Sequence, residues 1–461
     1  LRPHVVDDCR CAPRGSNGAH RRAGAVLSGA ILALRIGLLG LGTVGGGVAE
    51  FIQERSGRLT RLFGCQLVLA RVLVREPLKQ RSIDLAPSLL TTDPAAVLDD
   101  PSIAIIVEAM GGEEPALDYM RRALRAGKHL VTANKEVLAK HGPELLALAA
   151  QHNVDLYYEA SVGGGLPLIG PFKRDLLANQ ISSVRAIING TTNYILTRMA
   201  EAQVSFDAAL AEAQALGYAE PDPFNDVSGL DAVYKLAILA TLAFHSEVRP
   251  DQIFCEGITA LSARDFRFAA EMGYHIKLLA IGHDRLEGIE VRVHPSLVPK
   301  AQLLAGVNGV YNAVELDGDL VGRVLLYGRG AGSLPTASAI AGDVIDLARN
   351  IRKGISNRTE VTLGPTRPVL PMEAVSTRYY LRLHVADRPG VLAEIAAVLA
   401  RRQISIAAFI QQEVDAARQS AEIVIVTHRS READMRAAIA EFGSLTSVLE
   451  LAALLRIEDG S

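Results

Sequence analysis

The sequence predicts an α/β protein, with a Rossmann-type doubly wound parallel sheet, an α+β second domain and a C-terminal domain of the ferredoxin-like type. Three observations lead to this fold class. Near the start, an apolar run ends in a glycine turn that continues as a helix; strand-like and helix-like runs then alternate; and about 80 residues near the C-terminus have the order βαββαβ. At 461 residues, the chain is too long for one hydrophobic core, and roughly 150 residues per domain gives about three domains.

The composition excludes several classes of function. The 48 Lys and Arg nearly balance the 51 Asp and Glu, so no basic field favours a nucleic acid or a membrane surface as partner. The apolar run over residues 23–48 approaches the length of a membrane span, but an arginine interrupts it and its glycines fit a strand and turn better. The four cysteines are too scattered for a disulfide framework, and we interpret them as free thiols of a cytoplasmic protein. They are Cys9, Cys11, Cys65 and Cys255.

Residues 1–34 differ from the rest of the chain, because they are rich in Arg, Pro and Gly and show no periodicity. We expect a disordered extension here. An artefact of the assigned start and a targeting leader are the alternatives.

Residues 35–165 predict an NAD(P)-binding Rossmann domain. A strand over residues 33–39 ends in the turn Gly40-Leu41-Gly42-Thr43-Val44-Gly45, and a helix-like run follows. Gly40 permits the tight turn, Gly42 lets the backbone approach a pyrophosphate, and Gly45 allows close packing of helix on strand. Because the helix N-terminus then faces the phosphates, we assign cofactor binding to Gly40, Gly42, Thr43, Val44 and Gly45.

The following strand ends mark the rest of the expected cofactor site. The strand over residues 66–74 ends at Arg75-Glu76. An arginine there suits the 2′-phosphate of NADP and an acid suits the ribose hydroxyls of NAD, so Arg75 favours NADP while Glu76 leaves NAD open. A buried strand within 102–112 ends in glycines, and we add Gly111 to the cofactor-binding residues.

Two further strand ends carry candidate site residues. Lys135 follows a strand at the edge where open α/β sheets keep their ligand crevice; the alternative is an ordinary residue of a first helical turn. Glu159, followed by the glycine loop SVGGGLP, offers one carboxylate and several backbone carbonyls to a hard cation. The alternative there is a simple turn in which Glu159 caps a neighbour.

Residues 166–351 predict the catalytic domain, whose central feature is the segment GYAEPDPFNDVSGLDAVYK over 217–235. Asp231 and Lys235 are four residues apart on a helix and share a face. We expect five carboxylates to crowd toward this lysine: Glu212, Glu220, Asp222, Asp226 and Asp231. Asp226, Ser228 and Gly229 offer capping for the helix. A solvated surface ion pair is the alternative for the Asp231–Lys235 pair.

Two polar turns and a C-terminal module complete the chain. The turn at residues 189–193 suits either a polar ligand or helix capping, and the loop at 328–332 either returns to the cofactor or merely connects two elements. Residues 352–376 are proline-rich and predict a linker. Residues 377–456 hold the βαββαβ module, whose first turn contains Asp387 and Gly390.

Taken together, these motifs resemble the monofunctional bacterial homoserine dehydrogenases over about residues 35–457, and the terminal module resembles an ACT domain. The resemblance rests on GLGTVGGGV, TANKEVLAKHG, YEASVGGGLP, NGTTNYILTRM, LGYAEPDPFNDVSGLDAVYKLAIL and GRGAGSLPTAS. It implies reversible reduction of L-aspartate 4-semialdehyde to L-homoserine by NAD(P)H, in threonine, methionine and isoleucine biosynthesis. A dehydrogenase of another amino or hydroxy acid, and a regulator that senses nucleotide and amino acid without turnover, are the alternatives.

The resemblance also implies roles for residues. Lys235 corresponds to the proton donor, and Asp231 to the acid that orients it and holds substrate with Glu220 and Lys135. Lys135 also corresponds to a lysine near the nicotinamide. The acids around Lys235, including Asp226, suit the ammonium group of an amino-acid substrate. Gly217 and Gly332 correspond to cofactor contacts. A sodium or potassium site corresponds to Glu159 and the backbone of Val162, Gly164 and Leu166.

The family's regulation and assembly are implied in the same way. We expect residues 166–351 to form a dimerisation domain too, in a homodimer or homotetramer, and an amino acid such as threonine to bind near Asp387 and Gly390. One departure from the family is Asn225-Asp226, where relatives often have two adjacent acids; this puts any substrate role of position 225 in doubt.

Overall fold

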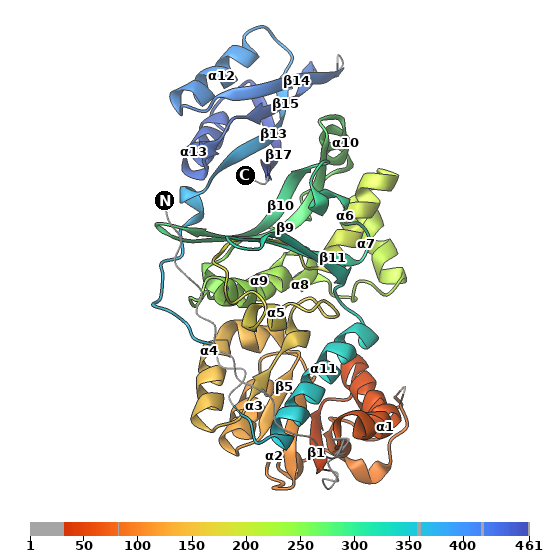
Figure 1. The fold of residues 1–461 in the computed structure, drawn as a ribbon. Coiled ribbons are helices and arrows are strands. Elements are labelled where there is room, and N and C mark those ends of the chain that lie inside the picture. The colour runs from red at the N-terminus through yellow and green to blue at the C-terminus, as the bar shows by residue number, and fades with distance from the viewer. Residues whose placement is uncertain (1–31, 82, 357–360, 416–418, 460–461) are drawn as a thin grey trace, which may run out of the picture.

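The computed structural model describes residues 32–81, 83–356, 361–415 and 419–459, so most of the predicted extension at 1–34 lies outside the described residues, as do Cys9 and Cys11. The molecule is elongated (Figure 1). A Rossmann domain lies at one end, a mixed sheet with helices lies in the middle, and the C-terminal module lies at the other end. The predicted fold class is confirmed.

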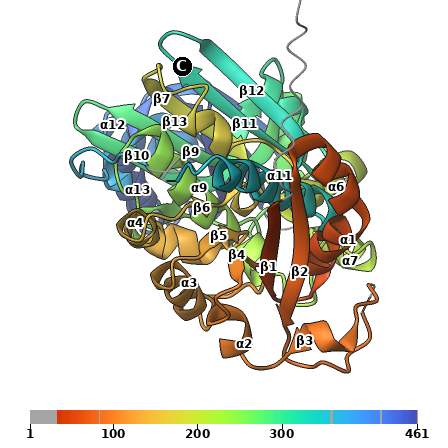
Figure 2. The ribbon, with the colours of Figure 1, turned by 60° about the horizontal axis from the view of Figure 1, so that its bottom comes forward.

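The Rossmann sheet has six parallel strands in the order β3-β2-β1-β4-β5-β6. Helices cover both faces, which explains the continuous apolar runs of the central strands. Figure 2 shows α1 beside β1 and β2, and α11 packs against α1 in the same hydrophobic core. The strands are β1 (Leu32–Leu39), β2 (Cys65–Leu73), β3 (Leu90–Thr91), β4 (Ile103–Glu108), β5 (His129–Thr132) and β6 (Leu156–Tyr157). The helices are α1 (Thr43–Phe63), α2 (Ala95–Leu98), α3 (Ala116–Arg125), α4 (Lys135–Gln151) and α11 (Ser333–Arg352).

The second sheet has 11 strands among the described residues, nine of which follow the order β12-β11-β7-β9-β10-β17-β13-β15-β14, while β8 and β16 each pair beside one of these nine. Its first part belongs to the middle of the molecule and its second part to the C-terminal module. The strands are β7 (Ile181–Ile187), β9 (Tyr274–Arg285), β10 (Gly288–Pro299), β11 (Tyr311–Gly318), β12 (Gly322–Arg329), β13 (Ser376–Ala386), β14 (Ile406–Asp415), β15 (Ser420–Thr427) and β17 (Val448–Ile457), with β8 (Phe254–Cys255) beside β10 and β16 (Ser430–Arg431) beside β13.

Helices cover this second sheet and carry most of the residues of the expected site. The α-helices are α5 (Ile169–Lys173), α6 (Gly190–Ala202), α7 (Phe206–Ala215), α8 (Phe224–Val227), α9 (Leu230–Ala243), α10 (Ala263–Glu271), α12 (Val391–Arg401) and α13 (Glu432–Phe442). Short 3₁₀ turns occur at η1 (Pro87–Leu89), η2 (Glu159–Ser161), η3 (Pro250–Gln252), η4 (Leu303–Gly306) and η5 (Met372–Ala374). None of the helices in the described ranges is long and apolar enough to cross a membrane.

The C-terminal module joins the middle sheet directly. The last strand, β17, pairs in parallel with β10 through Ser296 with Arg456 and Leu297 with Ile457. The described part of the 352–376 segment also packs on the sheet, since Ile289 donates to the Pro368 carbonyl at 2.8 Å and accepts from Leu370 at 2.8 Å. The sequence predicted a separate module and a linker, and did not reveal this continuous sheet.

Candidate active site

Lys235 lies on α9, a helix that is buried on almost every side rather than along one stripe. Its side chain is buried, and Nζ donates to Asp231 Oδ2 at 2.7 Å and to the Ile188 carbonyl at 2.8 Å. Burial lowers the pKa of Lys235 below its ordinary value, and the nearby charge of Lys135 lowers it too, while Asp231 opposes both. The solvated surface pair is therefore excluded, because this ion pair lies in the interior.

Asp231 is the centre of the cluster. Its second oxygen, Oδ1, forms an ion pair with Lys135 Nζ, so one buried carboxylate holds two lysines from different domains. Burial alone would raise the pKa of Asp231, but the two ammonium groups outweigh burial and hold that pKa well below its usual range. Asp231 is therefore charged at neutral pH.

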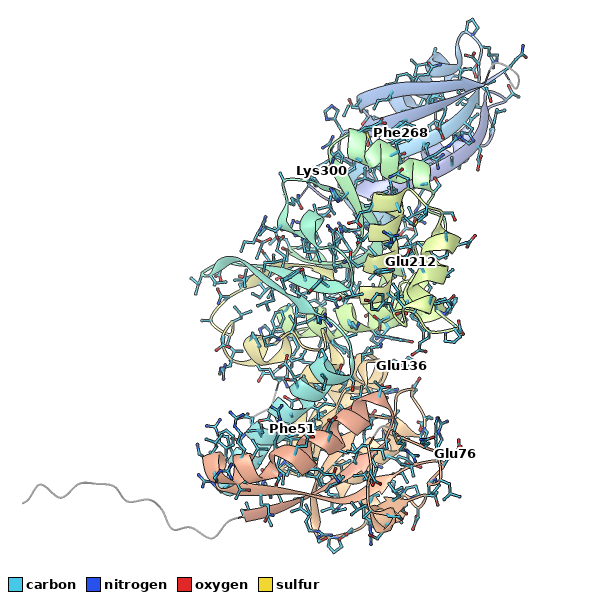
Figure 3. All side chains as sticks on the ribbon, turned by 90° about the vertical axis from the view of Figure 1, so that its right-hand side faces the viewer. Phe51, Glu76, Glu136, Glu212, Phe268 and Lys300 are labelled. Atoms are coloured by element: carbon cyan, nitrogen blue, oxygen red, sulfur yellow. The ribbon has the colours of Figure 1, made fainter. Side chains whose placement is uncertain are left out.

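Lys135 reaches the cluster because β5 and α4 place it there. It is the first residue of α4, and the preceding Asn134 caps that helix by accepting from the Val137 amide at 3.1 Å. Burial opposes the charge of Lys135, but its ion pair with Asp231 outweighs this and raises the pKa. Lys135 is thus a first-turn residue and also part of the cluster. Figure 3 shows its neighbour Glu136 where the Rossmann domain meets the middle of the molecule.

Asn189 lies in the turn that was predicted either to contact a ligand or to cap a helix. In the structure its side chain both caps a helix and binds two acids of the cluster. Its Oδ1 accepts from the Thr192 amide at 2.8 Å and so caps α6. Its Nδ2 donates to Asp226 at 2.7 Å and to Asp231 at 2.8 Å. This amide therefore fixes the two acids relative to each other. Burial and the charge of Asp231 raise the pKa of Asp226, while the Asn189 hydrogen bond lowers it.

One expectation about the acidic segment is wrong. Glu212 does not join the cluster: it accepts from Tyr194 at 2.8 Å and from Arg198 at 3.0 Å, on the outer side of α7 (Figure 3). Of the three predicted capping residues of α9, Gly229 is the N-cap, in a left-handed conformation and with no side-chain cap, and Asp226 is hydrogen-bonded to Asn189 instead. Glu220 lies on the exposed loop that begins at Gly217, near enough to Lys135 to help raise its pKa.

The glycine turn has the space that a dinucleotide phosphate requires. Gly40 has a φ of +96°, and a Cβ on Gly45 would lie 2.2 Å from the Gly40 carbonyl oxygen, so both positions demand glycine. A Cβ on Gly42 would meet nothing within 4 Å. The exposed backbone at Gly42 and the N-terminus of α1 at Thr43 and Val44 therefore form an open cradle that fits a pyrophosphate.

Three other predicted cofactor residues, Arg75, Gly111 and Gly332, belong to segments next to this turn. Arg75 and Glu76 are exposed just beyond β2, whose Leu73 carbonyl accepts from Gly40 at 3.0 Å. Gly111 is exposed beyond β4, next to the turn. Gly332 precedes α11, and there Ser333 Oγ donates to the Thr43 carbonyl at 2.9 Å, so the 328–332 loop does return to the glycine turn.

Sequence models of three families match this architecture in order. The model "Homoserine dehydrogenase, NAD binding domain" matches residues 40–159, the model "Homoserine dehydrogenase" matches residues 167–345, and the model "ACT domain" matches residues 379–446. The homoserine dehydrogenase of Synechocystis sp. is 45% identical over 436 residues, which cover 92% of this chain and all of that protein. This chain belongs to the homoserine dehydrogenase family.

Other relatives agree across the full length. The Bacillus subtilis homoserine dehydrogenase is 38% identical, over 92% of this chain and 98% of that protein. A solved structure of the Thiobacillus denitrificans homoserine dehydrogenase superposes with a TM-score of 0.85 at 43% identity, over 93% of this chain and 98% of that one. Homoserine dehydrogenases are NAD(P)-dependent oxidoreductases that act on a CH–OH group, interconverting L-homoserine and L-aspartate 4-semialdehyde. This is the reaction that the chain catalyses.

The glycine loop after β6 was predicted to bind the cation that the homoserine dehydrogenase family implies. Glu159 accepts backbone hydrogen bonds from Leu168, from Ile169 at 2.8 Å and from Gly170 at 2.7 Å, at the start of α5. These three bonds use three of about four lone-pair positions of the carboxylate. The contacts are those of the alternative, in which Glu159 caps a neighbour, and they leave the carboxylate little capacity for a metal.

The charged residues next to this loop, Lys173 and Asp343, also affect whether a cation could bind there. Lys173 lies with its Nζ 4.0 Å from the centre of the Tyr158 ring, and the Glu159 amide donates to Asp343 at 2.9 Å. Burial lowers the pKa of Lys173 to about 8 and raises that of Asp343 to about 8. Among the described residues, no group of three or more His, Cys, Asp and Glu side chains is arranged to hold a metal ion. No motif in the sequence indicates that Lys173 and Asp343 are buried near each other.

Proposed function

We propose that Lys235 is the proton donor in the reduction of L-aspartate 4-semialdehyde and that Asp231 positions it. The observation that carries this assignment is the single buried carboxylate that pairs with two lysines, one from α4 and one from α9. When the carbonyl carbon is reduced, its oxygen becomes an alkoxide and takes a proton from Lys235 Nζ. The N–H bond breaks as the O–H bond forms, and Asp231 and the Ile188 carbonyl keep the ammonium in place until then.

The acids around the lysines suit the amino-acid part of the substrate. Asp226 and Glu220 lie beside the pair, and their negative charge attracts the substrate ammonium. Lys135 is half-exposed, with 41% of its side chain accessible, so it can interact with the substrate carboxylate while it stays paired with Asp231. The test is turnover of aspartate semialdehyde against a panel of oxo-acids, and preference for another oxo-acid would contradict the assignment.

The nicotinamide cofactor supplies the hydride when it is bound. We assign its phosphates to the backbone of Gly40, Gly42 and Gly45 with Thr43 and Val44, and its other contacts to five further residues. These other residues are Arg75, Gly111, Lys135, Gly217 and Gly332. NADP is our proposed preference, because the exposed Arg75 at the end of β2 suits a 2′-phosphate, and Arg75→Gln should reduce the preference for NADPH over NADH. An unchanged ratio of kcat/KM for the two cofactors would contradict this.

Gly42→Ala tests the cradle without disturbing the fold. Because a Cβ at this position meets nothing within 4 Å and Gly42 has a φ of −86°, alanine fits the free protein. We expect an unchanged melting temperature but a rise of at least about 10-fold in the KM for NAD(P)H, since the methyl group takes the space of the pyrophosphate. Gly57→Ala, farther along α1, is the matched control and should leave that KM unchanged. Normal cofactor binding by Gly42→Ala would contradict the assignment.

A sodium or potassium ion on the loop of Glu159, Val162, Gly164 and Leu166 remains a separate proposal. The glycine loop offers backbone carbonyls, which suit a hard cation, whereas Glu159 already accepts three backbone hydrogen bonds. We derive no catalytic step from this ion. Activity in sodium or potassium chloride that exceeds activity in tetramethylammonium chloride at equal ionic strength would support it, and equal activity would contradict it.

We propose that threonine acts through the ACT domain, near the turn at Asp387 and Gly390. Gly390 caps α12 with a φ of +94°, and the Asp387 amide donates to the Gln419 carbonyl at 2.8 Å, so the turn has a fixed shape next to a helix N-terminus. We expect threonine to inhibit the full-length enzyme, and Asp387→Ala to raise the inhibitory concentration. Asp434→Asn, on α13 of the same domain, is the control. Equal inhibition of all three proteins would contradict this location.

The assembly, domain limits and compartment are also proposals. A homodimer or homotetramer is supported by the edge strand β12, in which Tyr327 is 54% exposed, and by the turn before it, where Leu320 and Val321 are 72% and 48% exposed. Light scattering of the purified chain measures its mass, and the mass of a monomer would contradict this proposal.

We retain residues 35–165, 166–351 and 377–456 as the three domains. A cytoplasmic location is also proposed, and the free thiols of Cys65 and Cys255 are consistent with it.

A further inference from the structure

A buried arginine connects the ACT domain to the middle of the molecule. Arg456, on β17, is 3% exposed. Its Nε and Nη2 donate to the two oxygens of Glu432 in the same domain at 3.0 and 2.6 Å, and its Nη1 donates to Glu256 Oε2 at 2.7 Å. Arg456 is also a residue of the β10–β17 pair, so its position follows the ACT sheet. Glu256 is thus bound to the ACT domain by a charge-assisted hydrogen bond.

Glu256 belongs to a short segment that is fixed on its other side as well. It directly follows β8, which pairs with β10 through Phe254 with Arg292 and Cys255 with Val293. The Glu256 amide donates to the Val293 carbonyl at 2.8 Å. The segment 254–258 therefore contacts both the strand β10 and, through Glu256, the strand β17 of the ACT domain.

This segment presses on the turn at residues 227–229. The Ile258 amide donates to the Val227 carbonyl at 2.9 Å, and Cys255 Sγ donates to the Ser228 carbonyl at 3.1 Å. A Cβ on Gly257 would lie 2.4 Å from the Val227 carbonyl oxygen, and one on Gly229 would lie 2.9 Å from Cys255 Sγ. Because the two backbones touch without space for a methyl group, a shift of one requires a shift of the other.

The turn at 227–229 connects α8 to α9, the two helices that carry Asp226 and Asp231. Asp226 is in α8, immediately before the turn, and Asp231 and Lys235 are in α9, immediately after it. Gly229 begins α9 with a φ of +88° and no side-chain cap, so neighbouring backbone rather than its own side chains fixes this end of the helix. Misplacement of reacting groups by about 1 Å can lower a rate by about 10²-fold.

We propose that Glu256 and Arg456 are positioning residues: their ion pair holds the 254–258 segment against the 227–229 turn and thereby sets the geometry of the Asp231–Lys235 pair. The ACT domain then acts on catalysis through this one contact. An amino acid bound to the ACT domain that moves β17 changes the position of the proton donor, without a need to reach the substrate pocket. This inference rests on the proposed roles of Lys235 and Asp231.

A second contact between the same two parts of the molecule provides a matched control. Arg264, on α10, pairs with Glu422 of β15 at 3.4 Å, and half of its side chain is exposed. Like Arg456, Arg264 is an arginine that pairs with a glutamate across the junction between the ACT domain and the middle of the molecule. Its helix, α10, does not contain the residues of the 227–229 turn. Arg264→Gln therefore removes a contact to the ACT domain without releasing the turn.

The test compares Glu256→Gln with Arg264→Gln in the full chain. For Glu256→Gln we expect kcat to fall about 5- to 50-fold with an unchanged KM for NADPH, because the dinucleotide turn is in another domain. We also expect the threonine concentration for half inhibition to change at least about 5-fold, the lower range of allosteric coupling. Gly257→Ala, which pushes directly on the Val227 carbonyl, should reproduce the loss of kcat with the ion pair intact.

Hydrogen exchange gives a readout that does not depend on activity. In Glu256→Gln, amides of residues 227–233 should exchange at least about 10-fold faster than in the parent, because the turn has lost its support, whereas Arg264→Gln should leave them unchanged. Parent-like exchange and kcat in Glu256→Gln would overturn the inference. Faster exchange in Glu256→Gln with a parent-like kcat would overturn the link to catalysis. A parent protein without activity, in which Glu256→Gln still speeds exchange and Arg264→Gln does not, would instead contradict the proposed function.

Discussion

Replacement of Lys235 by alanine is expected to lower kcat for aspartate-semialdehyde reduction by at least about 10²-fold. A positioned general acid contributes roughly 10²–10⁴-fold, and Lys235 Nζ is held by Asp231 and the Ile188 carbonyl in a buried site where water is a poor substitute. The KM for NADPH should change little, because the glycine turn is in the other domain. Steady-state kinetics of the purified variant measure both constants.

The variant must be compared with one that removes an ammonium group nearby. Lys140→Gln serves, because Lys140 is on α4 like Lys135 but pairs with Glu113 and Glu136 rather than with Asp231. Lys140→Gln should retain kcat within about threefold, as expected for exposed ion pairs. Turnover of a folded Lys235→Ala protein at the parent rate would remove this residue from the role of proton donor.

Local signals explain how much of the fold was predictable. The Rossmann domain could be recognised because the turn from Gly40 to Gly45, its strand and its helix are contiguous, and Gly40 and Gly45 have a steric reason within the fold. The parallel pairing of β10 with β17 could not be recognised, because the two strands are far apart in the sequence. Their alternating apolar residues are compatible with several partners, and only the packed fold selects one.

The candidate site shows the same division. The Asp231–Lys235 pair follows from helical spacing, which fixes both side chains on one face. The partner of that pair, Lys135, was identified as a strand-end residue and, through the family resemblance, as a residue near substrate and nicotinamide. Its ion pair with Asp231 was not predicted, because an ion pair between two domains has no signature in sequence. Glu212 was wrongly predicted to join the cluster because it is close to the other acids in sequence. Closeness in sequence does not determine where a side chain points, and on α7 the Glu212 carboxylate bonds Tyr194 and Arg198.

Replacement of Asp231 by asparagine should shift the pH dependence of kcat to lower pH. The Asp231 carboxylate favours the charged form of Lys235, whereas burial and the charge of Lys135 favour the neutral form. Without the carboxylate, the pKa of Lys235 falls further, because the adjacent negative charge that favoured the ammonium form is lost. Reduction needs the charged lysine, so its rate is lost as pH rises through that pKa, and in the variant this loss begins at a lower pH.

The reverse reaction gives the opposite sign and so checks the assignment. Oxidation of homoserine needs neutral Lys235 to accept the proton, so its rate rises with pH through the same pKa, and this rise should also move to lower pH in Asp231→Asn. Asp226→Asn should shift both limbs in the same direction but less, because Asp226 contributes a smaller part of the charge felt by Lys235. Two profiles that keep the parent midpoints in Asp231→Asn would show that another group titrates. Profiles that move in opposite directions would show that the two reactions use different residues, and either result contradicts a single lysine that both gives and takes the proton.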